Sequence, residues 1–93
     1  MINTGKLSGK VALITGGSSG IGLAIAGEFQ AAGARVAITG RNAERLNEAA
    51  HTLGGKPVTV VANTASVKDN AAMVHQVLAQ LGVIDVLVVN AGI

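Results

Sequence analysis

The residues most suggestive of chemistry are the glycines and serines of the segment TGGSSGIG, which runs from Thr15 to Gly22. This segment lies between the apolar run KVALI and the amphipathic run IGLAIAGEFQAAG. Glycines between a strand and a helix allow positive φ and a close approach of the backbone to a ligand. The first N–H groups of a helix attract anions. The segment therefore predicts a cradle for a phosphate group.

Two common phosphate-binding patterns do not fit this segment. The Walker A pattern G-x-x-x-x-G-K-[ST] matches the glycine spacing from Gly17 to Gly22, but Leu and Ala follow where it requires Lys and a hydroxyl residue. The dinucleotide pattern G-x-G-x-x-G, begun at Gly20, requires a third glycine where Ile25 stands. The spacing that fits is T-G-x-x-x-G-x-G, which starts at Thr15.

Four short apolar runs alternate with three amphipathic runs along the chain. The apolar runs are too short for helices, are bounded by Gly, Pro or Asn, and show no polar alternation, which predicts strands buried on both faces. The predicted strands are Val11–Thr15, Arg35–Thr39, Val58–Ala62 and Asp85–Val89.

The amphipathic runs predict three helices, each with an apolar stripe toward the core. The predicted stripes are Ile21, Ile25, Phe29 and Ala32; Leu46, Ala49, Ala50 and Leu53; and Val74, Val77, Leu78 and Leu81. Asn42 is the predicted N-cap of the second helix, and Ser66 with Asp69 forms a capping-box pattern at the start of the third. The helices are expected to end at the glycines Gly33, Gly54 and Gly82.

The resulting element order is βαβαβαβ within one domain of 93 residues. Right-handed crossovers turn this order into a doubly wound α/β fold, a Rossmann-like parallel sheet between two helix layers, with the strand order 3-2-1-4. In such a fold, ligands bind beyond the carboxyl ends of the strands, where the strand order reverses. TGGSSGIG lies at that point, after the first strand.

Composition argues against several other functions. The net charge is +2 with scattered cations, and Phe29 is the one aromatic residue, so we expect no nucleic-acid partner. The apolar runs are far shorter than the ~18 residues that a membrane span needs. The chain has no cysteine, and His51 and His75 stand apart from possible co-ligands, so no metal is expected. The polar N-terminus has no apolar h-region, which favours a cytoplasmic location.

The loop spacing and a second motif, VNAG at Val89–Gly92, together resemble the short-chain dehydrogenase/reductase family. The resemblance covers the whole chain. It implies that residues 1–93 are the N-terminal half of a Rossmann-type NAD(P)-binding domain. The cofactor-binding residues implied by the resemblance are Gly16, Ser18, Ser19, Gly20, Ile21, Gly22, Arg41, Asn63, Thr64, Asn90, Ala91 and Gly92.

The resemblance also implies a role for each group of these residues. The backbone from Ser18 to Ile21 would hold the pyrophosphate and the adenosine ribose, and Gly22 would let the helix pack closely on the sheet. Asn63, where the family usually has aspartate, would accept a hydrogen bond from the adenine amino group, and the Thr64 N–H would meet a ring nitrogen. In VNAG, a valine replaces the first asparagine of the family motif, and Asn90–Gly92 keep the close backbone approach.

The end of the second strand favours NADP over NAD. An NAD-binding member would carry an acid there, which binds the ribose 2′-OH and repels a phosphate. This sequence has Gly40 followed by Arg41, whose guanidinium suits a 2′-phosphate.

Family chemistry transfers a hydride between the nicotinamide and a carbonyl or alcohol carbon, and it uses a tyrosine in a Y-x-x-x-K motif as acid and base. The chain has no tyrosine, so no catalytic residue is predicted in it and the substrate stays open. The first interpretation is the NADP-binding portion of such an oxidoreductase. The alternatives are a stand-alone nucleotide-binding module without catalysis, and an interaction protein that has kept the fold without a ligand.

The last predicted strand, 85–89, is expected at an edge of the sheet. An apolar edge strand offers unpaired backbone groups to other chains. We therefore expect a homo-oligomer, or self-association through this edge.

Overall fold

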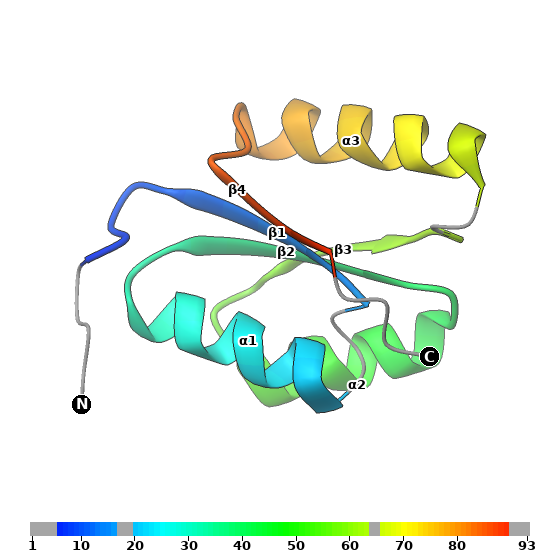
Figure 1. Ribbon diagram of the computed structural model, residues 1–93. Helices are drawn as coiled ribbons and strands as arrows, with labels where there is room; N and C mark the ends of the chain where they lie inside the picture. The colour runs from blue at the N-terminus through cyan, green and yellow to red at the C-terminus, as the bar shows by residue number, and fades with distance from the viewer. Residues whose placement is uncertain (1–5, 17–19, 64–65, 90–93) are drawn as a thin grey trace.

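The computed structural model describes residues 6–16, 20–63 and 66–89, which form three layers (Figure 1). A parallel sheet of four strands lies in the middle, with α1 and α2 on one face and α3 on the other. The strands are β1 (Val11–Thr15), β2 (Arg35–Gly40), β3 (Val58–Val61) and β4 (Val86–Val89). The helices are α1 (Gly20–Ala31), α2 (Ala43–Leu53) and α3 (Val67–Leu81).

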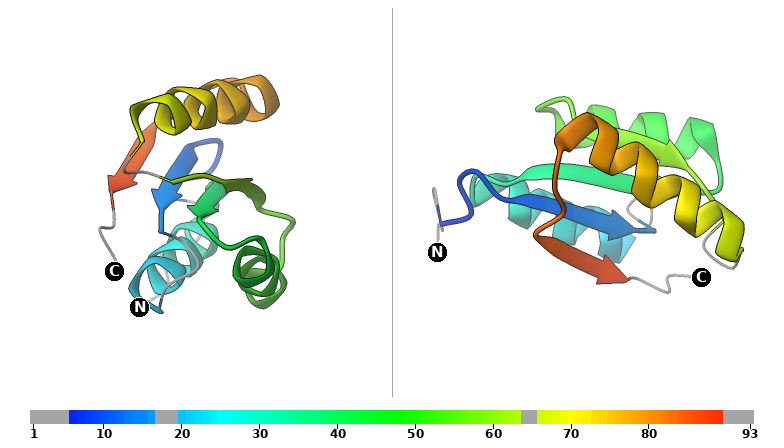
Figure 2. Two further views of the ribbon diagram at one scale, coloured as in Figure 1. Left: turned by 90° about the vertical axis from the view of Figure 1, so that its right-hand side faces the viewer. Right: turned by 90° about the horizontal axis from the view of Figure 1, so that it is seen from above.

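The strand order is β3-β2-β1-β4, as predicted, and every neighbouring pair is parallel (Figure 2). Each strand boundary lies within one residue of the prediction. β2 extends to Gly40, which pairs with Val61 of β3. Asp85 precedes β4 and fastens it to β1: its carboxylate accepts a hydrogen bond from the Val11 N–H at 2.8 Å, and its own N–H donates to the Val11 carbonyl at 2.9 Å.

The prediction that all strands are buried on both faces is confirmed for β1 and wrong for the two edge strands. All five residues of β1 are buried. In β4, Leu87 is 56% exposed and Val89 is 73% exposed, and Val61 of β3 is exposed as well. Leu87 pairs with Leu13, which packs in the cluster on the α3 face. A single helix does not cover that face of the sheet as far as β4.

The predicted stripe of α1 is wrong at Ile21, which is 70% exposed, because Gly22 and Ala26 are the residues that α1 buries. Ile25 and Phe29 pack against the core as expected. The helix ends as predicted at Gly33, which has φ 97°. The Gly33 N–H donates to the Gln30 carbonyl and the Ala34 N–H to the Phe29 carbonyl, the two bonds of a Schellman ending.

In α2 the predicted burial of Leu46 and Ala49 is confirmed. In α3 the burial predicted for Val74 and Leu78 is wrong, since these side chains are 36% and 40% exposed. The predicted burial of Val77 is confirmed, and Met73, which is not in the predicted stripe, is buried one turn before it on the face toward the sheet. Residues spaced by four lie on one face of a helix, so Leu81 completes the stripe of Met73 and Val77.

Two apolar clusters hold the layers together. The cluster under α1 and α2 consists of Ala12, Ile14, Ala26, Val36, Ile38, Leu46 and Ala49. The cluster under α3 consists of Leu13, Ala37, Val60, Ala62, Met73 and Val77. Alternate residues of β1 and β2 contribute to each, as the period of two in a strand requires.

Candidate functional site

The carboxyl ends of the strands and the N-termini of all three helices meet at one edge of the sheet, on the right in Figure 1. This follows from the parallel βα order, because each helix starts where its strand ends. The N-terminus of a helix carries unpaired N–H groups and a partial positive charge. The edge is therefore suited to an anionic ligand before any side chain is considered.

The turn from β1 into α1 is the first part of this edge. Thr15 is buried, and its hydroxyl donates to the Val88 carbonyl at 3.4 Å, which links the ends of β1 and β4. Gly16 follows with φ 70°, a left-handed conformation that strongly favours glycine. Gly22 is buried in the first turn of α1, which brings the helix close to the sheet.

The end of β2 contributes Arg41. This side chain is exposed and lies between Gly40, the last residue of the strand, and Asn42, the N-cap of α2. The Asn42 carbonyl oxygen Oδ1 accepts from the Arg45 N–H at 3.0 Å, as predicted for a cap. The cap and the strand hold the backbone on both sides of Arg41.

The end of β3 contributes Asn63, and two hydrogen bonds tie it to the start of α3. The Asn63 N–H donates to Asp69 Oδ2 at 2.9 Å, and the Ser66 N–H donates to the Asn63 carbonyl at 2.9 Å. The Asp69 N–H donates to Ser66 Oγ at 3.2 Å. Half of the predicted capping box is thus confirmed. The other half is wrong, because the Asp69 carboxylate bonds to Asn63 while the Ser66 N–H is already donated to the Asn63 carbonyl.

The structure brings the described part of the predicted site to this one edge: Gly16, Gly20, Ile21, Gly22, Arg41 and Asn63. Ala62 N–H donates to the Gly40 carbonyl at 2.9 Å, so the segments that carry Arg41 and Asn63 run side by side. The remaining predicted residues lie outside the described ranges: Ser18, Ser19, Thr64, Asn90, Ala91 and Gly92.

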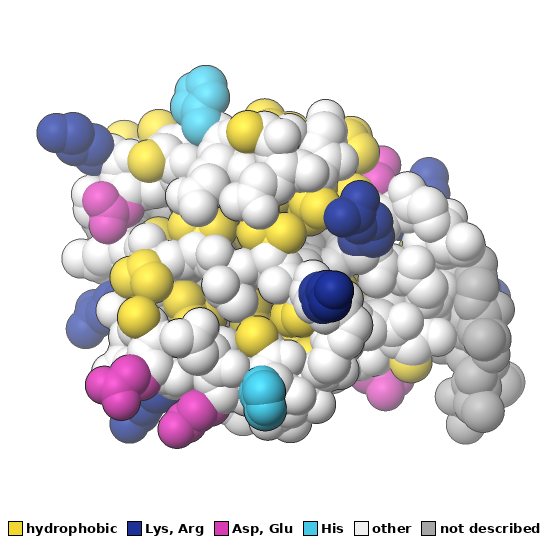
Figure 3. Space-filling view, turned by 180° about the vertical axis from the view of Figure 1, so that it is seen from behind, with side chains coloured by type: hydrophobic (Ala, Val, Ile, Leu, Met, Phe, Trp, Pro, Cys, Tyr) yellow, Lys and Arg dark blue, Asp and Glu magenta, His cyan; other side chains and the backbone are white. Residues whose placement is uncertain are grey.

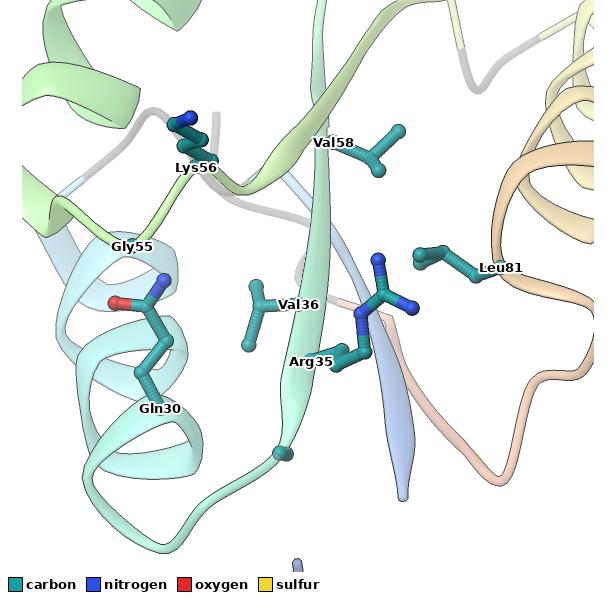
Figure 4. A pocket seen from close by; sticks show the side chains of 8 residues that line it. Gln30, Arg35, Val36, Gly55, Lys56, Val58 and Leu81 are labelled. Atoms are coloured by element: carbon teal, nitrogen blue, oxygen red, sulfur yellow. The ribbon is translucent and has the colours of Figure 1, made fainter. Parts of the chain in front are cut away.

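The opposite end of the sheet has a hollow of about 310 Å³ with two cationic residues, Arg35 and Lys56, in its lining. In Figure 4 the Arg35 side chain extends toward Leu81, whereas Lys56 lies across β2, near Gly55. The Gln30 side-chain N–H donates to the Gly54 carbonyl at 3.0 Å. The two cations do not converge, and the helices direct their carboxyl ends to this side.

No metal centre is found in the part of the chain that the structure describes. No three His, Asp or Glu side chains gather within residues 6–16, 20–63 and 66–89. His51 is on α2 and His75 is on α3, on opposite faces of the sheet. On the face in Figure 3, cationic and anionic side chains are interspersed. Among the described helices, none has the length and apolar character needed to cross a membrane.

Comparison with known proteins gives this geometry a family context. Residues 10–93 match the model of the short chain dehydrogenases. A cis-2,3-dihydrobiphenyl-2,3-diol dehydrogenase of Paraburkholderia xenovorans is 41% identical over 88 residues, which are 95% of this chain and 32% of that protein. The chain thus spans about one third of the length of this relative.

Solved structures agree with the fold. A short chain dehydrogenase from Mycobacterium smegmatis superimposes with a TM-score of 0.92 at 34% identity, over 100% of this chain and 41% of that one. An actinorhodin polyketide ketoreductase solved with NADPH superimposes with a TM-score of 0.86 at 38% identity, over 90% of this chain and 33% of that one.

Proposed function

The chain belongs to the short chain dehydrogenase family, and from this premise we propose that residues 1–93 are the NADP(H)-binding N-terminal half of a Rossmann-type domain. The complete protein would be an oxidoreductase that transfers a hydride between NADP(H) and a carbonyl or alcohol substrate. The ketoreductase neighbour solved with NADPH supports the choice of cofactor class.

The observation that carries the NADP assignment is the pair Gly40–Arg41 at the carboxyl end of β2. An exposed guanidinium follows the last residue of the strand, at the point where a carboxylate would select the 2′-OH of NAD. Guanidinium offers a charged, planar fork of donors to a phosphate dianion. Arg41 would therefore bind the 2′-phosphate.

The other predicted residues fit the rest of a dinucleotide. The positive φ of Gly16 and the burial of Gly22 give the short, closely packed turn that a pyrophosphate needs beside a helix N-terminus. In the proposal, Ser18–Ile21 hold the pyrophosphate and ribose through their backbone. Asn63 and Thr64 hold the adenine, and the backbone of Asn90–Gly92 approaches the cofactor.

In this proposal the bound cofactor supplies or accepts the hydride. The residues of this chain bind the phosphates, orient the dinucleotide along the carboxyl edge and fix the adenine. They do not supply the family's acid and base, because the chain contains no tyrosine. The proton transfer that accompanies the hydride is accordingly assigned to residues of a longer protein, and so is the choice of substrate.

Calorimetric titration of the chain with NADPH, NADH and ATP tests the proposal. We expect NADPH to bind about ten-fold or more tighter than NADH, because a hydrogen-bonded charge pair contributes about 1.5–3 kcal/mol. Arg41→Asp should remove this preference. Arg35→Asp is the matched control: it makes the same charge change at the other end of β2 and should leave the preference intact.

Two results would contradict parts of the proposal. Equal affinities for NADPH and NADH would refute the role of Arg41. Binding of ATP as tight as that of NADPH would refute a site for a dinucleotide.

The second candidate is a stand-alone nucleotide-binding module without catalysis, which the same carboxyl edge would serve. The two candidates predict the same binding and differ in gene context. An open reading frame that continues to a Y-x-x-x-K motif would support the oxidoreductase, whereas a stop codon after Ile93 would support the module.

We further propose that copies of the chain associate through β4. This edge strand exposes Leu87 and Val89, and edge strands readily pair with other chains. Light scattering should show a mass that rises with concentration, and a concentration-independent monomer would contradict this.

A cytoplasmic location stays a prediction, which fractionation of the source cells would test.

A further inference from the structure

We propose that Asp69 is a positioning residue for the adenine end of the dinucleotide. It acts through Asn63 and does not itself touch the cofactor. This inference rests on the proposed function, because it assigns a role toward the ligand that the carboxyl edge is proposed to hold.

The contacts of the Asp69 carboxylate differ from those of an ordinary helix cap. In a capping box, the acid at the third helical position bonds to the N–H of the cap residue itself. Here Asp69 Oδ2 reaches back six residues to the Asn63 N–H at 2.9 Å. The N–H of the cap residue, Ser66, donates instead to the Asn63 carbonyl at 2.9 Å. The charged group thus fastens the end of the β3 segment to the start of α3.

These bonds fix the backbone of Asn63 on both sides. Its N–H is held by a carboxylate and its carbonyl by the Ser66 N–H. The preceding residue, Ala62, is buried and donates to the Gly40 carbonyl at 2.9 Å. The Asn63 side chain therefore leaves from a fixed point, next to the strand end that carries Arg41.

A fixed starting point matters because binding is weakened when a loop must be ordered at the same time. A hydrogen bond to carboxylate is also stronger than one to a neutral acceptor. The carboxylate lies in the first turn of α3, where the helix dipole favours negative charge. Asp69 is thus suited to preorganise the polar contact that Asn63 is proposed to make with adenine.

If Asp69 served only to cap α3, its loss would have the same effect on cofactor binding as the loss of the Ser66 cap. A substitution of Ser66 therefore distinguishes a capping role of Asp69 from a positioning role. Ser66 Oγ caps the helix by accepting from the Asp69 N–H at 3.2 Å. Ser66→Ala removes this bond and destabilises the helix start, while the Asp69 carboxylate and the Ser66 N–H remain. Asp69→Ala removes the hold on Asn63. Asp69→Asn keeps an oxygen acceptor without the charge.

The test is a calorimetric titration of the wild-type chain and these three variants with NADP⁺ and with its ethenoadenine analogue. The fused ring of the analogue removes the adenine amino group and occupies the neighbouring ring nitrogen. We expect the wild-type chain to bind NADP⁺ about 5- to 10-fold more tightly than the analogue, the factor expected for one or two hydrogen bonds. Asp69→Ala should lower this ratio to below about 2, Asp69→Asn should lower it partly, and Ser66→Ala should keep it.

Amide hydrogen exchange without ligand gives a second readout, since the Asn63 N–H should exchange faster in Asp69→Ala than in Ser66→Ala. The positioning role would be overturned if Asp69→Ala kept the wild-type ratio of affinities for NADP⁺ and the analogue, or if Ser66→Ala lowered this ratio as much as Asp69→Ala does. Either result would leave the proposed function intact. A wild-type chain that binds both ligands equally would overturn the adenine contact and this inference with it. A wild-type chain that binds neither would overturn the proposed function itself.

Discussion

The two ends of the sheet look alike in composition and differ in what their backbones do. Each end has a glycine with positive φ and an exposed cation at or next to an end of β2: Gly16 and Arg41 at the carboxyl end, Gly55 and Arg35 at the amino end. The amino end even has a second cation, Lys56, and a hollow of about 310 Å³. Cations and hollows alone would therefore select the amino end as the anion site.

Helix direction reverses that choice. The N-termini of α1, α2 and α3 point to the carboxyl end, and their last carbonyl groups point to the amino end. At the amino end, the Gly54 N–H donates to the Ala50 carbonyl and the Gly54 carbonyl accepts from Gln30, so local groups pair with one another. The direction of the helices therefore favours the carboxyl end for a phosphate, and we propose that the side chains there select which phosphate is bound.

The largest expected effect on the free energy of unfolding comes from a substitution in the buried core, which supports both ends of the sheet. Ile38 is fully buried in the middle of β2, so Ile38→Ala should lower the free energy of unfolding by about 2–5 kcal/mol. Leu87→Ala, at an exposed position of β4, should cost less than about 1 kcal/mol. Urea unfolding measures both. If Leu87→Ala lowered the free energy of unfolding as much as Ile38→Ala, the exposed face of β4 would have to be covered in solution.

A smaller effect is expected from the amino end of β4. Asp85→Ala removes the carboxylate that accepts from the Val11 N–H and should destabilise the chain by about 1–3 kcal/mol, whereas Asp85→Asn keeps an acceptor and should cost less. The affinity of folded molecules for NADPH should stay within about two-fold, as measured by titration of each variant. A large loss of affinity would show that the two ends are coupled through β4.

The smallest change in stability is expected from substitutions of Gly16 and Gly55, the glycines with positive φ that the two ends have in common. Gly16→Ala and Gly55→Ala each place a Cβ on a left-handed residue and should cost about 1–2 kcal/mol. The new Cβ at Gly55 would lie 3.2 Å from Nε2 at the end of the Gln30 side chain. Gly16→Ala should weaken NADPH binding about ten-fold or more, and Gly55→Ala should leave it unchanged. Equal effects on binding would contradict the distinction between the two ends.

The sequence predicted the strand order and the position of the carboxyl edge, because short apolar runs, caps and glycine endings are local signals that tertiary packing did not override. The sequence did not correctly predict which side chains are buried where burial depends on how a helix packs against the sheet. Val74 and Leu78 were predicted to be buried together with Val77, but α3 turns Met73 and Val77 toward the sheet and leaves Val74 and Leu78 partly exposed. The link from Asp69 to Asn63 was also missed, because the local pattern predicts a bond to the cap residue and three-dimensional geometry diverts it.

Amide chemical shifts of the isotopically labelled chain test most directly whether the carboxyl edge binds NADP(H). On titration with NADPH, we expect saturable shifts at Gly16, Gly20, Gly22, Arg41 and Asn63, with little change at Gly54, Gly55 and Lys56. Saturable shifts at the amino end, with the carboxyl edge unmoved, would contradict binding at the carboxyl edge.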